Sequence, residues 1–329
     1  MRSLGLSRYA AVLTISSWGS PNVAAAIELQ LPIKCEIGVT CEIQNYLDLD
    51  PSPKARDYQC GSRTYDGHKG IDIRLPSMRE QRAGVDVLAA APGRVLRRRD
   101  EMPDISIREG GVEAVKDREC GNGVVIDHGD GWETQYCHMA QGSIVVKPGD
   151  TVEASQPIGH VGLSGMTEFP HLHFGVTFRK MLVEPFAFEA PPGSCGGGHS
   201  IWAPSLQAAL TYKPRAVLNT GFANGKVEMG TVEGGEVAAP TRETPLVGYV
   251  RTIGAKAGDI QKLTITGPDG ATVVENATQP LDRDKAQVMM FVGKKAPAGG
   301  WPSGSYNASY TISNGGTVVL ERSFATNLL

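Results

Sequence analysis

The stretch Gly123-Val-Val-Ile-Asp-His-Gly-Asp-Gly131 joins a short apolar run to a turn rich in glycine and aspartate. An apolar run of this length is typical of a β-strand, and glycine and aspartate favour the tight turns that connect antiparallel strands. Similar short runs recur on both sides of this stretch, at 85–90, 142–146 and 157–162. The pattern predicts an antiparallel β architecture for this part of the chain.

The residues after about 200 continue the alternation but carry no cysteine and no histidine. Residues 262–266 and 271–274 flank a Gly-Pro-Asp-Gly turn, and alternate apolar positions from Tyr306 to Ile312 precede an Asn-Gly-Gly turn at 314–316. About 130 residues of this kind predict an immunoglobulin-like β-sandwich. The predicted fold class is therefore all-β, with an antiparallel, barrel-sandwich-like core followed by this sandwich.

The first 26 residues have the features of a secretory signal: Arg2 and Arg8, a short apolar run, and small residues at 24–26. The apolar run is too short to span a bilayer, so we expect an exported protein with no membrane insertion. We expect the periplasm rather than the external medium, since no cell-wall-targeting repeat is recognisable. Without the signal, 30 basic residues face 35 acidic ones, a net charge of −5, which argues against nucleic acid as a partner.

The chain has six cysteines, and all of them precede residue 196. An even number of cysteines in an exported protein indicates disulfide bonds, although six cysteines allow fifteen pairings. We expect Cys35 and Cys41 to close a short hairpin. A zinc-thiolate site is the less favoured interpretation, because no Cys-x2-Cys spacing is present.

These signals divide the chain into four predicted parts. They are a signal peptide (1–26), an N-terminal segment with Cys35 and Cys41 (27–56), a domain that carries the chemistry (57–195) and an immunoglobulin-like sandwich (196–329). The N-terminal segment is too short to bury a core alone, so we expect it to pack on the following domain.

Histidines and an aspartate with the spacing of metal ligands occur at two places, His68-x3-Asp72 and His171-Leu-His173, with His138 between them. Zinc accepts imidazole nitrogen and carboxylate oxygen, and a catalytic site has three protein ligands and one open position. Residues i and i+2 of a strand share one face, so His171 and His173 should face one cleft. His68 and Asp72 can meet only if the chain bends, and we expect Gly70 to permit this.

The motifs His68-x3-Asp72, Thr134-Gln-Tyr-Cys-His-Met and Pro170-His-Leu-His-Phe together resemble the lysostaphin-type zinc metallo-endopeptidases, which cut peptide cross-bridges in bacterial cell walls. The resemblance covers roughly residues 60 to 188. It implies His68, Asp72 and His173 as ligands of one zinc ion per chain, with His138 and His171 as catalytic residues. It also implies hydrolysis of peptidoglycan stem or cross-link peptides by zinc-activated water.

Two features depart from the usual pattern of that family. The loop 165–169 carries a charge at Glu168 and bulk at Phe169 beside the predicted cleft, and the charged stretch 97–119 predicts a long inserted loop that rims the cleft. Cys137 directly precedes His138, so a disulfide there would rigidify the wall that holds this histidine.

Other functions compete with this one. A non-catalytic cell-wall-binding or regulatory protein of the same fold would not need five imidazole and carboxylate groups in one cleft. A zinc D,D-carboxypeptidase would use the same chemistry in a differently shaped cleft. A latent form in which Asn45 blocks the metal is the least favoured. We also expect that the C-terminal domain positions the enzyme or binds an envelope protein.

Overall fold

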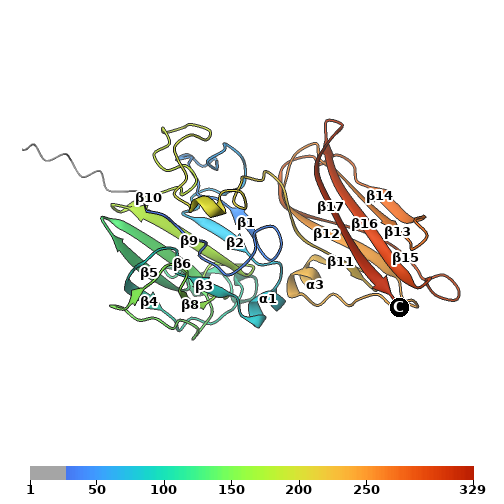
Figure 1. Cartoon of the computed structure of the whole chain (residues 1–329), viewed down its shortest axis with the longest axis horizontal. Coiled ribbons are helices and arrows are strands. Elements are labelled where there is room, and N and C mark those ends of the chain that lie inside the picture. The colour runs from blue at the N-terminus through green and yellow to red at the C-terminus, as the bar shows by residue number, and fades with distance from the viewer. Residues whose placement is uncertain (1–26) are drawn as a thin grey trace, which may run out of the picture.

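The computed structural model describes residues 27–329, and the predicted signal peptide lies outside them. Two groups of β-sheets lie side by side, with the short helices α1 (Met78–Ala83) and α3 (Met229–Gly234) near their junction (Figure 1). The fold is antiparallel and mostly β, which confirms the predicted fold class. Within residues 27–329, every helix is too short or too polar to cross a membrane.

The first group is an eight-stranded sheet in the order β1-β2-β9-β6-β5-β4-β7, with β10 attached to β9. The strands are β1 (Glu42–Asn45), β2 (Ile71–Arg74), β4 (Gly93–Arg99), β5 (Asn122–Gly129), β6 (Trp132–Met139), β7 (Thr151–Val152), β9 (His171–Phe178) and β10 (Met181–Leu182). Leu172 and Phe174 of β9 point into the core, so His171 and His173 occupy the other face.

A two-stranded sheet of β3 (Asp86–Leu88) and β8 (Pro157–His160) shares the same core. The N-terminal segment contributes Leu29, Ile33 and the whole of β1 to this unit, as expected for a segment without its own core. Ile201, Trp202 and Leu210 also belong to this core. We therefore propose that the C-terminal unit begins near residue 216 rather than at 196.

The predicted strand over 142–146 is wrong. Ile144 and Val146 are buried as its pattern requires, but the segment lies outside the sheets. The Arg98 guanidinium donates hydrogen bonds to the Ile144 and Val146 carbonyl oxygens at 3.2 and 2.9 Å. These carbonyl groups are thus satisfied by a side chain instead of a neighbouring strand.

The second group is a sandwich of two antiparallel sheets, β11-β12-β15 and β14-β13-β16-β17. Its strands are β11 (Ala216–Ala223), β12 (Leu246–Ala255), β13 (Ile260–Thr266), β14 (Thr272–Ala277), β15 (Lys285–Lys294), β16 (Gly304–Asn314) and β17 (Thr317–Leu328). The fourth strand pairs with the third, whereas in constant-type immunoglobulin domains it joins the sheet of the first two. The sandwich therefore differs from a constant-type immunoglobulin domain in its strand order, but its seven strands still surround one core.

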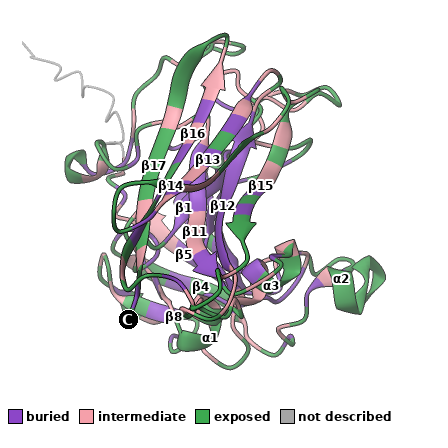
Figure 2. Cartoon of the chain, turned by 90° about the vertical axis from the view of Figure 1, so that its right-hand side faces the viewer, coloured by how far each residue is buried: buried purple, intermediate pink, exposed green. Residues whose placement is uncertain are grey.

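The predicted hairpin near the end of the chain is confirmed. Tyr306, Ala308, Tyr310 and Ile312 are all buried, and β16 turns into β17 through Gly315 and Gly316. Both glycines have positive φ angles, which this tight turn requires and which glycine adopts without strain. In β12, by contrast, every residue is buried, because this central strand lies between the sandwich core and the first group (Figure 2).

Three disulfides join the six cysteines: Cys35–Cys41, Cys60–Cys195 and Cys120–Cys137. The expected Cys35–Cys41 pair is confirmed. Cys60–Cys195 links positions 135 residues apart, whereas Cys35–Cys41 spans only six. A long closed loop restricts the unfolded chain more than a short one does.

We expect a Cys60→Ala/Cys195→Ala variant to lose about 2–4 kcal/mol of unfolding free energy, because the longest cross-link is removed from the unfolded state. Denaturant unfolding of the oxidised protein measures this change. The control is Cys35→Ala/Cys41→Ala, for which we expect a smaller loss. An equal or larger loss in the control would contradict the loop-length argument.

The carboxyl group of Glu184 is buried in the first unit. Glu184 follows β10 and is 5% exposed; its Oε1 accepts the Phe186 N–H at 3.0 Å, while its Oε2 has no partner among the described residues. Burial raises the pKa of Glu184 to about 8. The carboxyl group therefore ionises more readily in the unfolded chain than in the folded one.

Because the folded-state pKa is the higher one, stability should fall as the pH rises from about 4.5 to about 8. Glu184→Gln should remove this dependence and stabilise the metal-free protein at pH 7 by on the order of 3 kcal/mol, with little effect at pH 4.5. Denaturant unfolding in chelator at both pH values measures it. Glu189→Gln, whose side chain is 69% exposed, is the control. Equal changes in the two variants would refute the assignment.

Candidate metal centre

Three predicted ligands converge on one point. Asp72 Oδ1 lies 3.0 Å from His68 Nε2 and 2.9 Å from His173 Nδ1, and the two nitrogens are 3.2 Å apart. Asp72 and His173 are register partners on β2 and β9, while His68 lies in the loop that enters β2. The chain thus bends between His68 and Asp72, as expected.

Gly70 has a different role from the one predicted. Its φ angle is not positive, so the bend does not use the backbone freedom of glycine. A Cβ at this position would lie 2.6 Å from the Phe174 carbonyl oxygen and 2.8 Å from His173 Nε2. Glycine is therefore required because the loop passes directly against β9.

The cluster is buried and strongly polar. Burial disfavours the Asp72 carboxylate, but His68 and His171 outweigh this effect and hold the pKa of Asp72 well below its usual value. Burial likewise lowers the pKa of His68, but the Asp72 carboxylate more than compensates and raises it. A buried anion between imidazole groups is an environment that favours a cation.

The spacing of the three atoms fits zinc. Ligands at the usual zinc bond lengths of about 2.0–2.1 Å in a tetrahedral arrangement lie about 3.3 Å from one another. The three distances here are 2.9 to 3.2 Å. Two neutral imidazoles and one carboxylate are also a ligand set that zinc accepts.

Two neighbouring groups orient these ligands. The Tyr46 carbonyl oxygen lies 2.7 Å from His68 Nδ1, and because a carbonyl only accepts, Nδ1 carries a proton and Nε2 is the atom that would bind a cation. Asn45 donates a hydrogen bond from Nδ2 to Asp72 Oδ2 at 2.8 Å, opposite the converging atoms. Asn45 therefore holds the carboxylate from behind, a different role from the metal-blocking one considered from the sequence.

The predicted catalytic histidines lie beside this cluster. His171 Nε2 is 3.4 Å from Asp72 Oδ1, and its Nδ1 faces the Phe169 carbonyl oxygen at 2.9 Å and Thr167 Oγ1 at 3.1 Å. His138 contacts His171, with 4.7 Å between ring centroids. The fold thus brings all five predicted residues together.

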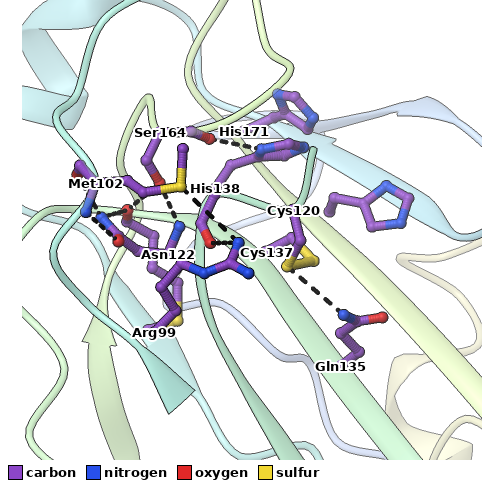
Figure 3. The surroundings of a disulfide bond; sticks show 12 residues. Arg99, Met102, Cys120, Asn122, Gln135, Cys137, His138, Ser164 and His171 are labelled. Atoms are coloured by element: carbon purple, nitrogen blue, oxygen red, sulfur yellow. Dashed lines mark hydrogen bonds between the residues drawn. A yellow bond between two sulfur atoms is a disulfide. The ribbon is translucent and has the colours of Figure 1, made fainter. Parts of the chain in front are cut away.

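The surroundings of His138 include the disulfide between Cys120 and Cys137 (Figure 3). His138 donates its backbone N–H to the Cys120 carbonyl oxygen at 2.8 Å, and its Nδ1 lies 2.8 Å from the Ser164 carbonyl oxygen. Burial, followed by the charges of His171 and His173, holds the pKa of His138 well below its usual value. His138 is therefore neutral at neutral pH, with its proton on Nδ1.

The stretch 97–119 is not a single loop. β4 extends to Arg99, and the remainder contains helix α2 (Ile107–Gly110) and a 3-10 helix (Val112–Val115). The Ser106 side chain caps α2 by accepting the Arg108 N–H. Arg108 forms an ion pair with Glu168 at 2.6 Å. The insertion therefore lies against the loop that precedes His171.

Residues 66–185 match peptidase family M23. Among curated proteins, the chain is 34% identical over 90 residues to the peptidoglycan DD-endopeptidase ShyB of Vibrio cholerae, which is 27% of this chain and 21% of that protein. It is 29% identical over 124 residues to the DD-carboxypeptidase/endopeptidase Mpg of Neisseria meningitidis, 38% of this chain and 23% of that protein.

An uncharacterized metalloprotease of Buchnera aphidicola is 28% identical over 118 residues, 36% of this chain and 25% of that protein. The matched segments therefore span a quarter or less of these relatives. A zinc-containing peptidase from Vibrio cholerae of known structure is 25% identical, with a TM-score of 0.30 over 45% of this chain and 40% of that one. The similarity to peptidase family M23 is therefore confined to one part of the chain, residues 66–185.

Proposed function

We propose that this protein is an exported zinc metallo-endopeptidase that hydrolyses peptide bonds in peptidoglycan stem or cross-link peptides. The observation that carries the proposal is the convergence of His68 Nε2, Asp72 Oδ1 and His173 Nδ1 beside two further histidines. The names of the M23 relatives, which include peptidoglycan DD-endopeptidases, support this substrate class.

His68, Asp72 and His173 would hold the zinc ion. When bound, zinc supplies a Lewis acid and lowers the pKa of water toward 7. Asn45 and the Tyr46 carbonyl group fix the orientation of Asp72 and His68, so that the ligands need little rearrangement on metal binding.

His171 would act as the general base and then as the general acid. Its Nδ1 is held by the Phe169 carbonyl oxygen, which leaves the Nε2 lone pair directed toward the cluster. In this role Nε2 accepts a proton from the attacking water and returns it to the nitrogen of the leaving amine.

His138 has the same arrangement, with the Ser164 carbonyl oxygen at Nδ1 and neutral imidazole at neutral pH. In this state His138 accepts a hydrogen bond at Nε2 rather than donating one. We infer that His138 orients the attacking water and becomes a donor to the developing oxyanion only after protonation.

The disulfides support export. Three disulfide bonds form and persist in oxidising compartments, of which the periplasm is one. We propose a periplasmic location, where peptidoglycan peptides are accessible, and the disulfides support export to such a compartment.

The purified protein should contain one equivalent of zinc and should release soluble fragments from purified sacculi. His173→Ala should lose both properties, because it removes a ligand from the cluster. The control is His160→Ala, an exposed histidine that pairs with Asp86 and should change neither property. Metal analysis and fragment release measure both. Full activity in His173→Ala would disprove the mechanism.

Liquid chromatography of the fragments separates the competing functions. An endopeptidase converts cross-linked dimers into monomers, whereas a D,D-carboxypeptidase releases single terminal amino acids. Zinc binding without release of any fragment would favour the non-catalytic cell-wall-binding protein.

Asn45→Ala should weaken zinc binding by about 10–100-fold, because Asp72 loses the hydrogen bond that orients it. Competition with a chromophoric chelator measures the dissociation constant. Asn224→Ala, at an exposed position of the C-terminal unit, is the control and should bind zinc like the wild type. Equal affinities in the two variants would show that the Asn45 contact has no role in metal binding.

A further inference from the structure

The second residue after Asp72 on β2 is a buried arginine. Arg74 is 1% exposed, lies on the same face of the sheet as Asp72 and pairs in register with His171. Its guanidinium carbon lies 3.8 Å from the centre of the Phe169 ring, and the Phe169 carbonyl oxygen is the group that holds His171. Arg74 therefore belongs to the surroundings of the candidate metal centre.

The C-terminal sandwich reaches this arginine. Glu233 of α3 forms an ion pair with Arg74, and Gln287 of β15 accepts a hydrogen bond from Arg74 Nη1 at 3.3 Å. Arg251 of β12 binds the same Glu233 oxygen and donates a hydrogen bond to the Pro76 carbonyl oxygen. These contacts fix α3 beside the loop that precedes His171.

A hollow of about 70 Å³ lies where these parts meet. Arg74 and Phe169 line it from the first unit, and Met229, Gly230 and Glu233 line it from α3. The ion pair between Arg108 and Glu168, both exposed, lies at its rim. The hollow is thus built jointly by the M23 domain, the inserted helix α2 and the sandwich.

Two buried polar atoms of the lining residues have no partner among the described residues: Arg74 Nε, a donor, and Glu233 Oε1, an acceptor. Unsatisfied buried atoms of this kind are uncommon and indicate a missing partner. Two arginines and two glutamates line the hollow, so their charges balance. A neutral group with one acceptor and one donor complements an arginine and a glutamate that line the same hollow, and a peptide amide is such a group.

We propose that this hollow is a subsite for a backbone amide of the substrate peptide, so that the C-terminal sandwich takes part in substrate binding. The proposal rests on the proposed peptidase function. Asp72 and Arg74 are two positions apart on a strand, roughly 7 Å. Phe169, which lines the hollow, also contacts His171, with 5.1 Å between ring centroids, so the hollow lies next to the candidate metal centre.

Gly230→Phe tests the subsite, because Gly230 lines the hollow and a Cβ there meets no atom within 4 Å. The variant should fold normally while its ring occupies the hollow. Gly225→Phe is the matched control: a Cβ at Gly225 also meets no atom within 4 Å, but this glycine lines a different surface of the sandwich. Melting temperatures of both variants should equal that of the wild type.

The substrate for the test is the cross-linked muropeptide dimer released from sacculi by a muramidase. In Gly230→Phe we expect KM to rise about tenfold, equivalent to about 1.4 kcal/mol of lost binding, with kcat within about twofold of the wild type. Gly225→Phe should match the wild type. Identical kinetics in the two variants would overturn the subsite and leave water as the partner of Arg74 Nε.

Calorimetric titration of the metal-free proteins with the same dimer separates this proposal from the proposed function. Weaker binding by Gly230→Phe than by Gly225→Phe supports the subsite even if the wild type cleaves nothing, in which case only the peptidase function fails. Equal binding by the two variants, or no binding by the wild type, overturns the subsite.

Discussion

The buried carboxylate of Asp72 is the constraint on which the rest of the site depends. A carboxylate that is 2% exposed has lost its hydration and must be compensated by nearby donors or positive charge. His68, His171 and His173 surround Oδ1, and Asn45 binds Oδ2. These partners come from β1, from β9 and from the loop before β2. The register of β1, β2 and β9 therefore determines which polar groups surround the Asp72 carboxylate.

Main-chain carbonyl groups orient three histidines of the site. The carbonyl oxygens of Tyr46, Ser164 and Phe169 each face the Nδ1 atom of one histidine, His68, His138 and His171 respectively. Each of these Nδ1 atoms therefore carries a proton, which leaves Nε2 as the atom that would bind a cation or exchange a proton. Because backbone groups cannot rotate away, the three tautomers are set by the fold.

The two β units are coupled through charge as well as through apolar packing. Arg74 and Arg251 are almost fully buried, and both bind Glu233, so neither can lose this carboxylate without leaving a buried charge unpaired. The same Arg74 packs on Phe169, next to His171. The sandwich thus contacts the first unit beside the loop that precedes His171.

Local signals in the sequence were enough for many strands and for the residue types of the site. Alternation at Tyr306–Ile312 followed by two turn glycines predicts a hairpin, because both signals act within a few residues. The same kind of pattern gave a wrong prediction of a strand at 142–146. There Arg98, more than forty residues away, donates the hydrogen bonds that a neighbouring strand would have provided. Local pattern does not record such long-range partners.

The five residues of the centre could be named from the sequence, because zinc chemistry restricts the residue types and three motifs together resemble those of a known family. The way in which they are held depends on contacts across the fold. Asn45 meets Asp72 through the register of β1 and β2, the Ser164 carbonyl group reaches His138 from another loop, and Glu233 meets Arg74 from a different unit. These contacts join residues distant in sequence and have no local signature, so packing alone places them.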